Sequence, residues 1–402
     1  MLQKSFLICL NSLYLFAFIY PISIAAANIL LGIMVIFLFS KKIYFNKIAI
    51  LLYTIPALIF ISTLLSNSAV DGFLVSSGYK NEYGFVIKHF IWLNLFYLIL
   101  INCKYDKIKL VRAFLMGVFV SEIVSYLIFF DLIDVDYLKS LKILFKNASP
   151  SNPSPFMHHI FYSVFLGVAI LLILEFYKEL KSPFYFLILI SAIVNLFLNG
   201  GRTGQIAFLV SLIVYLILKF KRPIISFLIA IFIFFFAYLF SPIFKKRINT
   251  AISDIKMIQK GEFNTSLGIR SAIYIVSKDL IDLKTIIFGL GAGDAKKIFL
   301  EKSKKYYEIL KVVAHTHNQY LQLLFDTGIM GILVIFYIFY LLIKDKNPFN
   351  IAIVVFFAFA FLTDVLLYRP KTYLLFLFVL GLAYSNSSSK AFGSKTLIDF
   401  SQ

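Results

Sequence analysis

Charged residues are scarce in this sequence of 402 residues, since Asp, Glu, Lys and Arg make up only 15% of it, against about a quarter in soluble proteins. There are only two cysteines, both in or next to apolar runs, so a disulfide framework is excluded and no thiol chemistry is expected. Apolar residues reach 61%, which is more than one soluble core can bury. This composition excludes a disordered chain and an ordinary soluble enzyme, and it predicts an all-α polytopic membrane protein.

Twelve apolar runs approach the ~20 residues that a helix needs to cross a bilayer. They cover residues 5–20, 22–39, 48–65, 84–102, 111–130, 156–176, 184–199, 205–218, 224–240, 320–343, 351–368 and 372–385. Nine of the predicted spans lie in residues 1–240 and three in residues 320–385. Residues 241–319 contain no run of membrane length and are predicted to form a loop subdomain between the ninth and tenth spans. Residues 386–402 are predicted to be a Ser-rich cytoplasmic tail.

The net charge is strongly positive, at +19. A basic soluble protein would suggest a nucleic-acid partner, but here lysine and arginine stand between apolar runs, where they encode membrane orientation. Segments on the side of the N-terminus carry more than twice as many of them as the short segments on the other side. Both termini are therefore predicted to be cytoplasmic and residues 241–319 extracytoplasmic, and no nucleic acid is expected. Within 241–319, apolar positions at 273–281 predict an amphipathic helix on the membrane surface.

Four of the five histidines, His158, His159, His315 and His317, are predicted to lie near the extracytoplasmic face. Such a group suggests a metal site, but no carboxylate or cysteine stands at a ligand spacing beside them, so no metal is expected. His317 and Asn318 begin a predicted span at the water interface, where a neutral imidazole can take a proton from a hydroxyl group. The alternative is an ordinary start of a helix without a chemical role.

Gly200-Gly-Arg-Thr-Gly204 is predicted to form a tight turn on the extracytoplasmic side. Its Arg202 is the only ionisable residue in a long apolar neighbourhood, and a guanidinium group matches the oxygens of a phosphate. Backbone N–H groups exposed by glycines such as Gly201 would add to an anion site. The alternative is that Arg202 only reaches lipid phosphates. Arg270, in Ser266-Leu-Gly-Ile-Arg270, is a second candidate for phosphate binding.

Two acidic residues fall inside predicted spans. Glu122 lies in the middle of one, and Asp364 lies near the extracytoplasmic end of another. Carboxylates within a membrane suggest proton relays or ion pairs. Asp364 stands five residues before Arg369, so the simpler interpretation is an ion pair between these two.

Several motifs follow one another along the chain, and their order can be compared with known families. They are the Gly200–Gly204 turn, the Ser-Leu-Gly-x-Arg motif ending at Arg270, a Phe288-Gly-x-Gly-x-Gly293 turn, and His317-Asn318 followed by Gly328 and Gly331. In order and in placement relative to the spans, they resemble the bacterial O-antigen ligase family, part of a superfamily of membrane glycosyltransferases that also contains polymerases. The resemblance covers about residues 195–335.

The resemblance implies an all-helical, GT-C-like glycosyltransferase of the bacterial inner membrane, with its active site on the periplasmic face. Such an enzyme takes a glycan from undecaprenyl diphosphate, and a ligase transfers it to a sugar hydroxyl of the lipid A–core by an inverting displacement. Carried over residue by residue, Arg202 and Arg270 would bind the diphosphate, and His317 would act as general base. No metal, nucleotide or other cofactor is implied.

Three further residues, Gly201, His315 and Asn318, are expected to contact the substrate because they flank these positions. Two other functions stay open on the sequence alone. One is a polymerase of the same superfamily, which joins repeat units. The other is a transporter or flippase of lipid-linked sugars, in which Glu122 and Asp364 would couple transport to protons.

Cysteine labelling tests the predicted orientation. In a variant without native cysteines, Lys260→Cys or Lys304→Cys should react with a membrane-impermeant maleimide added to the outside of spheroplasts, because residues 241–319 are predicted to be extracytoplasmic. Labelling only in inside-out vesicles would contradict both the orientation and a periplasmic active site, since the donor glycan would then lie on the opposite face.

Overall fold

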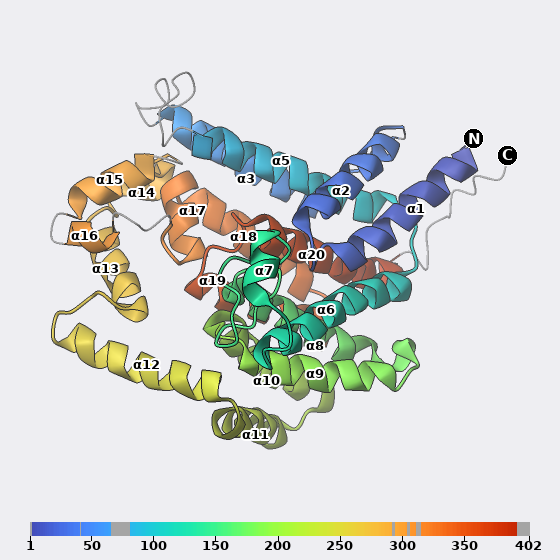
Figure 1. The fold of residues 1–402 in the computed structure, drawn as a ribbon. Helices are drawn as coiled ribbons and strands as arrows, with labels where there is room; N and C mark the ends of the chain where they lie inside the picture. Colours follow the sequence, from blue (N-terminus) through green and yellow to red (C-terminus); the bar gives the residue numbers. More distant parts are fainter. Residues whose placement is uncertain are drawn as a thin grey trace.

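The structure, a computed structural model, describes residues 2–40, 42–65, 81–291, 294–303, 306–310 and 315–391. In these ranges all regular elements are helices, apart from one isolated bridge between Ser149 and Asn152 (Figure 1). The helices over the apolar runs are α1 (Leu2–Ile19), α2 (Ile24–Phe39), α3 (Lys47–Leu65), α5 (Asn81–Asn102), α6 (Lys107–Phe129), α8 (His159–Leu180), α9 (Phe184–Leu198), α10 (Arg202–Phe220), α11 (Pro223–Phe240), α17 (Gln319–Thr327), α18 (Ile329–Ile343), α19 (Pro348–Thr363) and α20 (Pro370–Ala391).

Helix α8 forms the centre of the bundle. In its most apolar stretch 72% of the residues are buried, as expected for a helix that is apolar on all sides. Helices α6, α9, α10, α19 and α20 pack against it. The contact with α19 is close at Gly167, where a Cβ atom would lie 2.6 Å from the ring of Phe356. Glycine at this position therefore lets the two helices approach each other.

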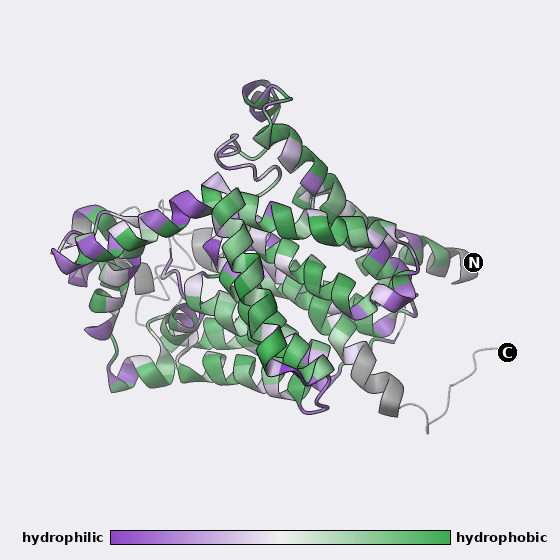
Figure 2. Cartoon of the chain, turned by 90° about the horizontal axis from the view of Figure 1, so that it is seen from below, coloured by the Kyte–Doolittle hydropathy of each residue, from purple (hydrophilic) through white to green (hydrophobic). Residues whose placement is uncertain are grey.

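The lengths and composition of the helices fit a membrane protein. Five described helices, α3, α6, α8, α10 and α11, are long and apolar enough to cross a membrane, and seven further apolar helices are shorter. In α11 only 11% of the apolar stretch is buried, which fits a helix that faces lipid. Hydrophobic residues run along most bundle helices, whereas hydrophilic ones gather at the helix ends and toward one side of the molecule (Figure 2). The all-α fold is confirmed and agrees with a polytopic membrane protein, and the number of twelve crossings stays a prediction.

The predicted span over residues 320–343 is corrected by the structure, because a break at Gly328 divides it into α17 and α18. Gly328 has φ 65° and ψ −166°, a conformation open essentially to glycine alone. A Cβ atom on Gly328 would collide with the carbonyl oxygen of Ile287. A Cβ atom on Gly289 would lie 2.7 Å from the carbonyl oxygen of Phe325 and 2.8 Å from the nitrogen of Gly328. Two glycine turns thus pack against each other and interrupt the helix.

The segment between α11 and α17 is folded. It contains α12 (Pro242–Gln259), α13 (Ser266–Lys278), α14 (Leu283–Phe288), α15 (Asp294–Lys302) and α16 (Tyr307–Leu310). The predicted amphipathic helix corresponds to α13, but Ile273 and Val276 pack inside the segment, together with Leu310 and with Phe325 of α17. Only part of the apolar face, such as Ile275 at 44% exposure, is left for a membrane surface. Helix α17 therefore shares a core with this segment.

Two predicted features fall partly outside the described residues. The Phe288–Gly293 turn is described as far as Gly291. The predicted tail begins at residue 386, but α20 continues to Ala391, and the remainder lies outside the described part of the chain.

The break between α17 and α18 predicts a difference between two glycines. Gly328→Ala should lower the stability by about 1–3 kcal/mol from backbone strain, and more from the collision with Ile287. Gly261→Ala is the matched control, because Gly261 also has a positive φ, of 82°, but nothing within 4 Å of its Cβ position. It should cost only ~1 kcal/mol. Thermal unfolding of both variants in detergent measures the difference, and equal midpoints would show that the close packing at Gly328 contributes nothing.

Candidate functional site

The Gly200–Gly204 turn joins α9 to α10, and two of its glycines let α10 begin directly against α8. A Cβ atom on Gly201 or Gly204 would collide with Ser163 of α8. The N–H of Gly204 donates to Ser163 Oγ (3.1 Å), and the N–H of Gly201 donates to Asn199 Oδ1 (2.7 Å). The N–H of Gly201 is thus already bonded within the protein, and the contact of Gly201 with substrate stays a prediction. These two glycines serve helix packing.

Arg202, the first residue of α10, reaches the start of α13. Its Nη2 donates to Ser266 Oγ (3.1 Å) in the first turn of that helix. Arg270 lies one turn further along α13, and its Nε is buried without a hydrogen-bond partner among the described residues. The positive charge of Arg270 acts on Arg202. The two arginines that the sequence selected, each from a different motif, thus lie in one cationic region.

His317 lies in the short loop before α17 and has a left-handed backbone, with φ 52°. This conformation is unfavourable for a residue other than glycine, so the neighbouring residues must hold it. Thr316 Oγ1 donates to the carbonyl oxygen of Asn318 (2.8 Å). Asn318 Oδ1 caps α17 by accepting hydrogen bonds from the N–H groups of Tyr320 (2.9 Å) and Leu321 (3.1 Å). The loop that carries His317 is therefore tied to the start of α17.

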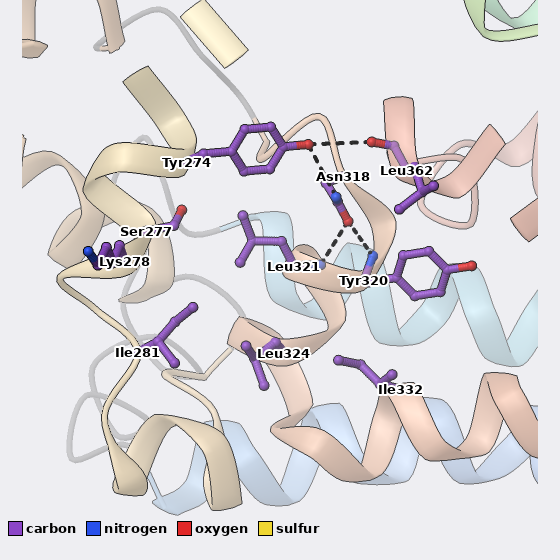
Figure 3. Close-up of a pocket in the computed structure, with 10 residues that line it drawn as sticks. All are labelled: Tyr274, Ser277, Lys278, Ile281, Asn318, Tyr320, Leu321, Leu324, Ile332 and Leu362. Atoms are coloured by element: carbon purple, nitrogen blue, oxygen red, sulfur yellow. Dashed lines mark hydrogen bonds between the residues drawn. The ribbon is translucent and has the colours of Figure 1, made fainter. Parts of the chain in front are cut away.

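The other end of the Asn318 side chain links this loop to α13 and α19. Asn318 Nδ2 donates to the hydroxyl oxygen of Tyr274 (3.2 Å), and the Tyr274 hydroxyl donates to the carbonyl oxygen of Leu362 (3.4 Å) (Figure 3). Both polar atoms of the Asn318 amide are thus bonded within the protein. The sequence predicts that Asn318 contacts the substrate. In the structure its side chain holds the loop that carries His317 in place, by bonding to Tyr274 and to the first turn of α17.

A cavity of about 620 Å³ lies beside Asn318, between α13, α17, α18 and α19 (Figure 3). Its walls are mainly apolar, with polar groups from Tyr274, Ser277, Lys278 and Asn318. The lining residues are Tyr274, Ser277, Lys278, Ile281, Asn318, Tyr320, Leu321, Leu324, Ile332 and Leu362. Such a lining suits an apolar chain that carries a polar group at one end.

Asp364, at the end of α19, brings His315 and His317 together. Its Oδ1 accepts a hydrogen bond from His315 Nε2 (3.1 Å) and lies 3.7 Å from His317 Nδ1. The carboxylate is 3% exposed, and the two imidazole rings are 4.3 Å apart. The ion pair of Asp364 with Arg369 that the sequence suggested is wrong, since among the described residues the carboxylate contacts the two histidines instead.

The electrostatics of this group leave His317 neutral. Burial lowers the pKa of His317 from its ordinary 6.5 to about 4, and the positive charges of His315, Arg270 and Arg369 act in the same direction, whereas Asp364 opposes them. Burial alone would raise the pKa of Asp364, but the hydrogen bond from His315, the charges of His315 and His317 and the N–H of Val365 together outweigh burial and bring this pKa to about 2. At neutral pH an uncharged imidazole therefore lies beside an ionised carboxylate, a pair that can take up a proton.

The same three side chains could hold a metal ion. Donor atoms of His315, His317 and Asp364 lie within 4.8 Å of one another. The sequence argument against a metal, that no carboxylate stands near the histidines, is corrected, because Asp364 comes from a distant part of the chain. Three ligands suffice for a catalytic zinc site. The positive charges of Arg270 and Arg369 both act on His317, and they would repel a metal ion bound by these three side chains.

Two arginines of this region were not predicted as site residues. The charge of Arg369 acts on His317 and His158, and its Nε is buried without a partner among the described residues. The charge of Arg247, from α12, acts on Arg202 and His158. Its sequence context, directly after two lysines, looks like an ordinary solvated stretch. One feature of the sequence could have pointed to Arg247. Asp254 follows it after two helical turns, so α12 carries a cation and an anion on the same face.

His158 and His159 lie at the start of α8, with their rings 4.0 Å apart. The Nδ1 of His158 caps the helix by accepting from the N–H of Ile160 (3.4 Å). Burial lowers the pKa of His158, with Arg369 and Arg247 adding to the effect and Asp364 opposing it. Glu122 lies elsewhere, fully buried in α6, where Ser191 Oγ donates to its carboxylate. The histidines border the cationic region, and Glu122 does not contribute to it.

The fold and the site together define a class of protein, an all-helical membrane protein with arginines gathered beside a neutral imidazole and a carboxylate. The family model described as O-antigen ligase matches residues 186–336, which include Arg202, Arg270 and His317. Over this segment the resemblance to the O-antigen ligase family that the motifs suggested is confirmed. No curated protein sequence matches the chain.

The low pKa of His317 predicts an unusual pH profile. If His317 is the general base that its motif implies, it works only when unprotonated, so kcat/KM for glycan transfer should stay level from pH 8 to about 5 and fall only as the pH approaches about 4. Asp364→Asn removes the charge that opposes this shift, so the fall should move to still lower pH while kcat decreases. Transfer rates measured between pH 4 and 8 check both. A fall centred near 6.5 would show that burial does not control this imidazole.

Proposed function

We propose that this protein is an O-antigen ligase, which transfers a finished glycan from undecaprenyl diphosphate to a sugar hydroxyl of the lipid A–core on the periplasmic face of the inner membrane. The proposal includes both termini on the cytoplasmic side and needs no metal ion. The observation that carries it is that Arg270, whose charge acts on both Arg202 and His317, stands beside a neutral His317 that faces the Asp364 carboxylate.

The arginines would act on the leaving group. When the acceptor oxygen attacks the anomeric carbon of the donor sugar, the bond from that carbon to the diphosphate oxygen breaks, and negative charge develops on the diphosphate. Guanidinium groups already in place stabilise this charge more in the transition state than in the ground state. Arg202 and Arg270 have this role in the proposal, since they come from separate helices and enclose a cationic region.

His317 would take the proton from the acceptor. Its Nδ1 faces Asp364, so the opposite ring nitrogen, Nε2, is the one that would accept the hydroxyl proton as the new glycosidic bond forms. The ionised Asp364 then stabilises the imidazolium. His315 donates a hydrogen bond to the same carboxylate, which makes it a positioning residue for Asp364. Because displacement occurs from the side opposite the diphosphate, the anomeric configuration is inverted.

The acceptor distinguishes a ligase from a polymerase. Purified protein in detergent should transfer glycan from the lipid-linked donor to lipid A–core but not to a lipid-linked repeat unit. His317→Ala should reduce turnover by roughly 10²–10⁴, the range for a lost general base, with donor binding retained. Gel analysis of both acceptors measures this. In cells, loss of the gene should leave long chains on undecaprenyl diphosphate and a bare core.

Each competing function has its own outcome in these experiments. Transfer to the repeat unit, or a core with one repeat unit in the deletion strain, would identify a polymerase. A requirement for a proton gradient, with no transfer in detergent, would indicate a transporter. The assay should proceed unchanged in EDTA. A loss that added Zn²⁺ restores would instead assign a metal ion to His315, His317 and Asp364.

A further inference from the structure

The first glycine of the Gly200–Gly204 turn has a different neighbour from the other two. The three atoms nearest to a Cβ placed on Gly200 all belong to Arg247, with Nη2 at 2.8 Å, Nε at 2.9 Å and Cζ at 3.2 Å. Gly200 is not among the glycines with positive φ, so its backbone conformation does not require glycine. What a glycine provides at this position is space for the guanidinium group of Arg247.

The start of α12 places Arg247 over this glycine. Ser241 Oγ donates to the carbonyl oxygen of Phe197 at the end of α9 (2.7 Å), and the ring of Phe244 packs edge-on against the ring of Phe197, with centroids 5.0 Å apart. The first turn of α12 is thereby fixed to the end of α9. Arg247 follows on the next turn of α12, at the point where the chain passes from α9 into the Gly200 turn.

The surroundings of Arg247 contain more positive than negative charge. In the part of the chain that the structure describes, no carboxylate forms an ion pair with Arg247. Its charge acts on Arg202, which is also repelled by Arg270. The acid that attracts Arg202, Asp254, is buried and its Oδ2 already accepts the N–H of Leu267 (3.1 Å). Guanidinium groups held together without enough acid are typical of a site for an anion with several oxygens.

We propose that Arg247 is a third ligand of the donor's diphosphate, and that Gly200 fixes the guanidinium group of Arg247 beside Arg202. This inference rests on the proposed function, since it assumes a diphosphate-linked donor. When the bond to the sugar breaks, the diphosphate gains a further charged oxygen beyond those that two forked guanidinium groups contact, so a third group stabilises the leaving group. Arg247 should therefore favour a diphosphate over a monophosphate.

Binding measurements in detergent test the proposal, with undecaprenyl diphosphate and undecaprenyl monophosphate as the probes. Arg247→Ala should weaken diphosphate binding by about 10- to 100-fold, the range for loss of a charged hydrogen bond, and should weaken monophosphate binding less. Lys246→Ala is the matched control, because it removes the neighbouring, exposed positive charge from the same helix, and it should bind both lipids as the wild type does.

Gly200→Ala tests the geometry separately from the charge. The added methyl group would displace the guanidinium group of Arg247 while every arginine remains. Gly200→Ala and Arg247→Lys should therefore both lose selectivity for the diphosphate, although neither changes the net charge. Thermal unfolding of each variant shows whether the fold is kept, and if Arg247→Ala does not fold, these two variants decide the outcome.

The results distinguish this inference from the proposed function. If Arg202→Ala weakens diphosphate binding but Arg247→Ala, Arg247→Lys and Gly200→Ala bind normally, Arg247 is not a ligand and the proposed function stands. If Lys246→Ala weakens binding as much as Arg247→Ala, general charge explains the effect and the inference is overturned. If Arg202→Ala also binds the diphosphate normally, the proposed function fails as well.

Discussion

The close contact between α10 and α8 is the constraint on which the rest of the site depends. Because Gly201 and Gly204 have no side chains, the first turn of α10 lies directly on Ser163. This fixes the direction in which Arg202 leaves the helix. One residue later, Thr203 accepts a hydrogen bond from Thr363 of α19 (2.9 Å), immediately before Asp364. A single packed junction of three helices thus fixes both the arginine and the carboxylate, and sites built on packed helices hold their geometry better than sites on loops.

The arrangement of charge is unfavourable in the absence of a ligand. Arg247 and Arg270 both repel Arg202, and the nearby carboxylates of Asp254 and Asp364 already accept hydrogen bonds from other donors. Nε atoms of buried guanidinium groups are also left without partners within the described residues, which costs free energy. Folding of the surrounding helices must offset this cost. An anion with several oxygens would remove the repulsion between the arginines and supply the missing hydrogen bonds. Part of the free energy of anion binding would therefore come from relieving the unfavourable charge arrangement of the unbound protein.

Hydropathy predicted the positions of the bundle helices well, because burial in lipid or in the bundle needs apolar residues in either case. It could not predict the break at Gly328, where composition stays apolar and only backbone geometry changes. Motif order indicated Arg202, Arg270 and His317, since each stands in a local pattern. The contact of Asp364 with the histidines depends on how α19 packs, and no local pattern encodes a pairing over such a distance in sequence. Arg247 was missed for a different reason: two lysines precede it, its spacing from Asp254 is a weak signal, and its contact with Gly200 is visible only in the structure.

The break between α17 and α18 has a mechanical consequence. Phe325 packs α17 into the core of the segment between α11 and α17, whereas α18 is an apolar helix of the bundle. Helices adapt to bilayers of different thickness by tilting. Because the helix is interrupted at Gly328, α18 can tilt without turning α17, which is held by its own packing against the segment. Arg270 and the loop with His317 lie in the same segment, so they keep their positions relative to each other when α18 tilts. The distance between these two groups then does not depend on the lipid composition.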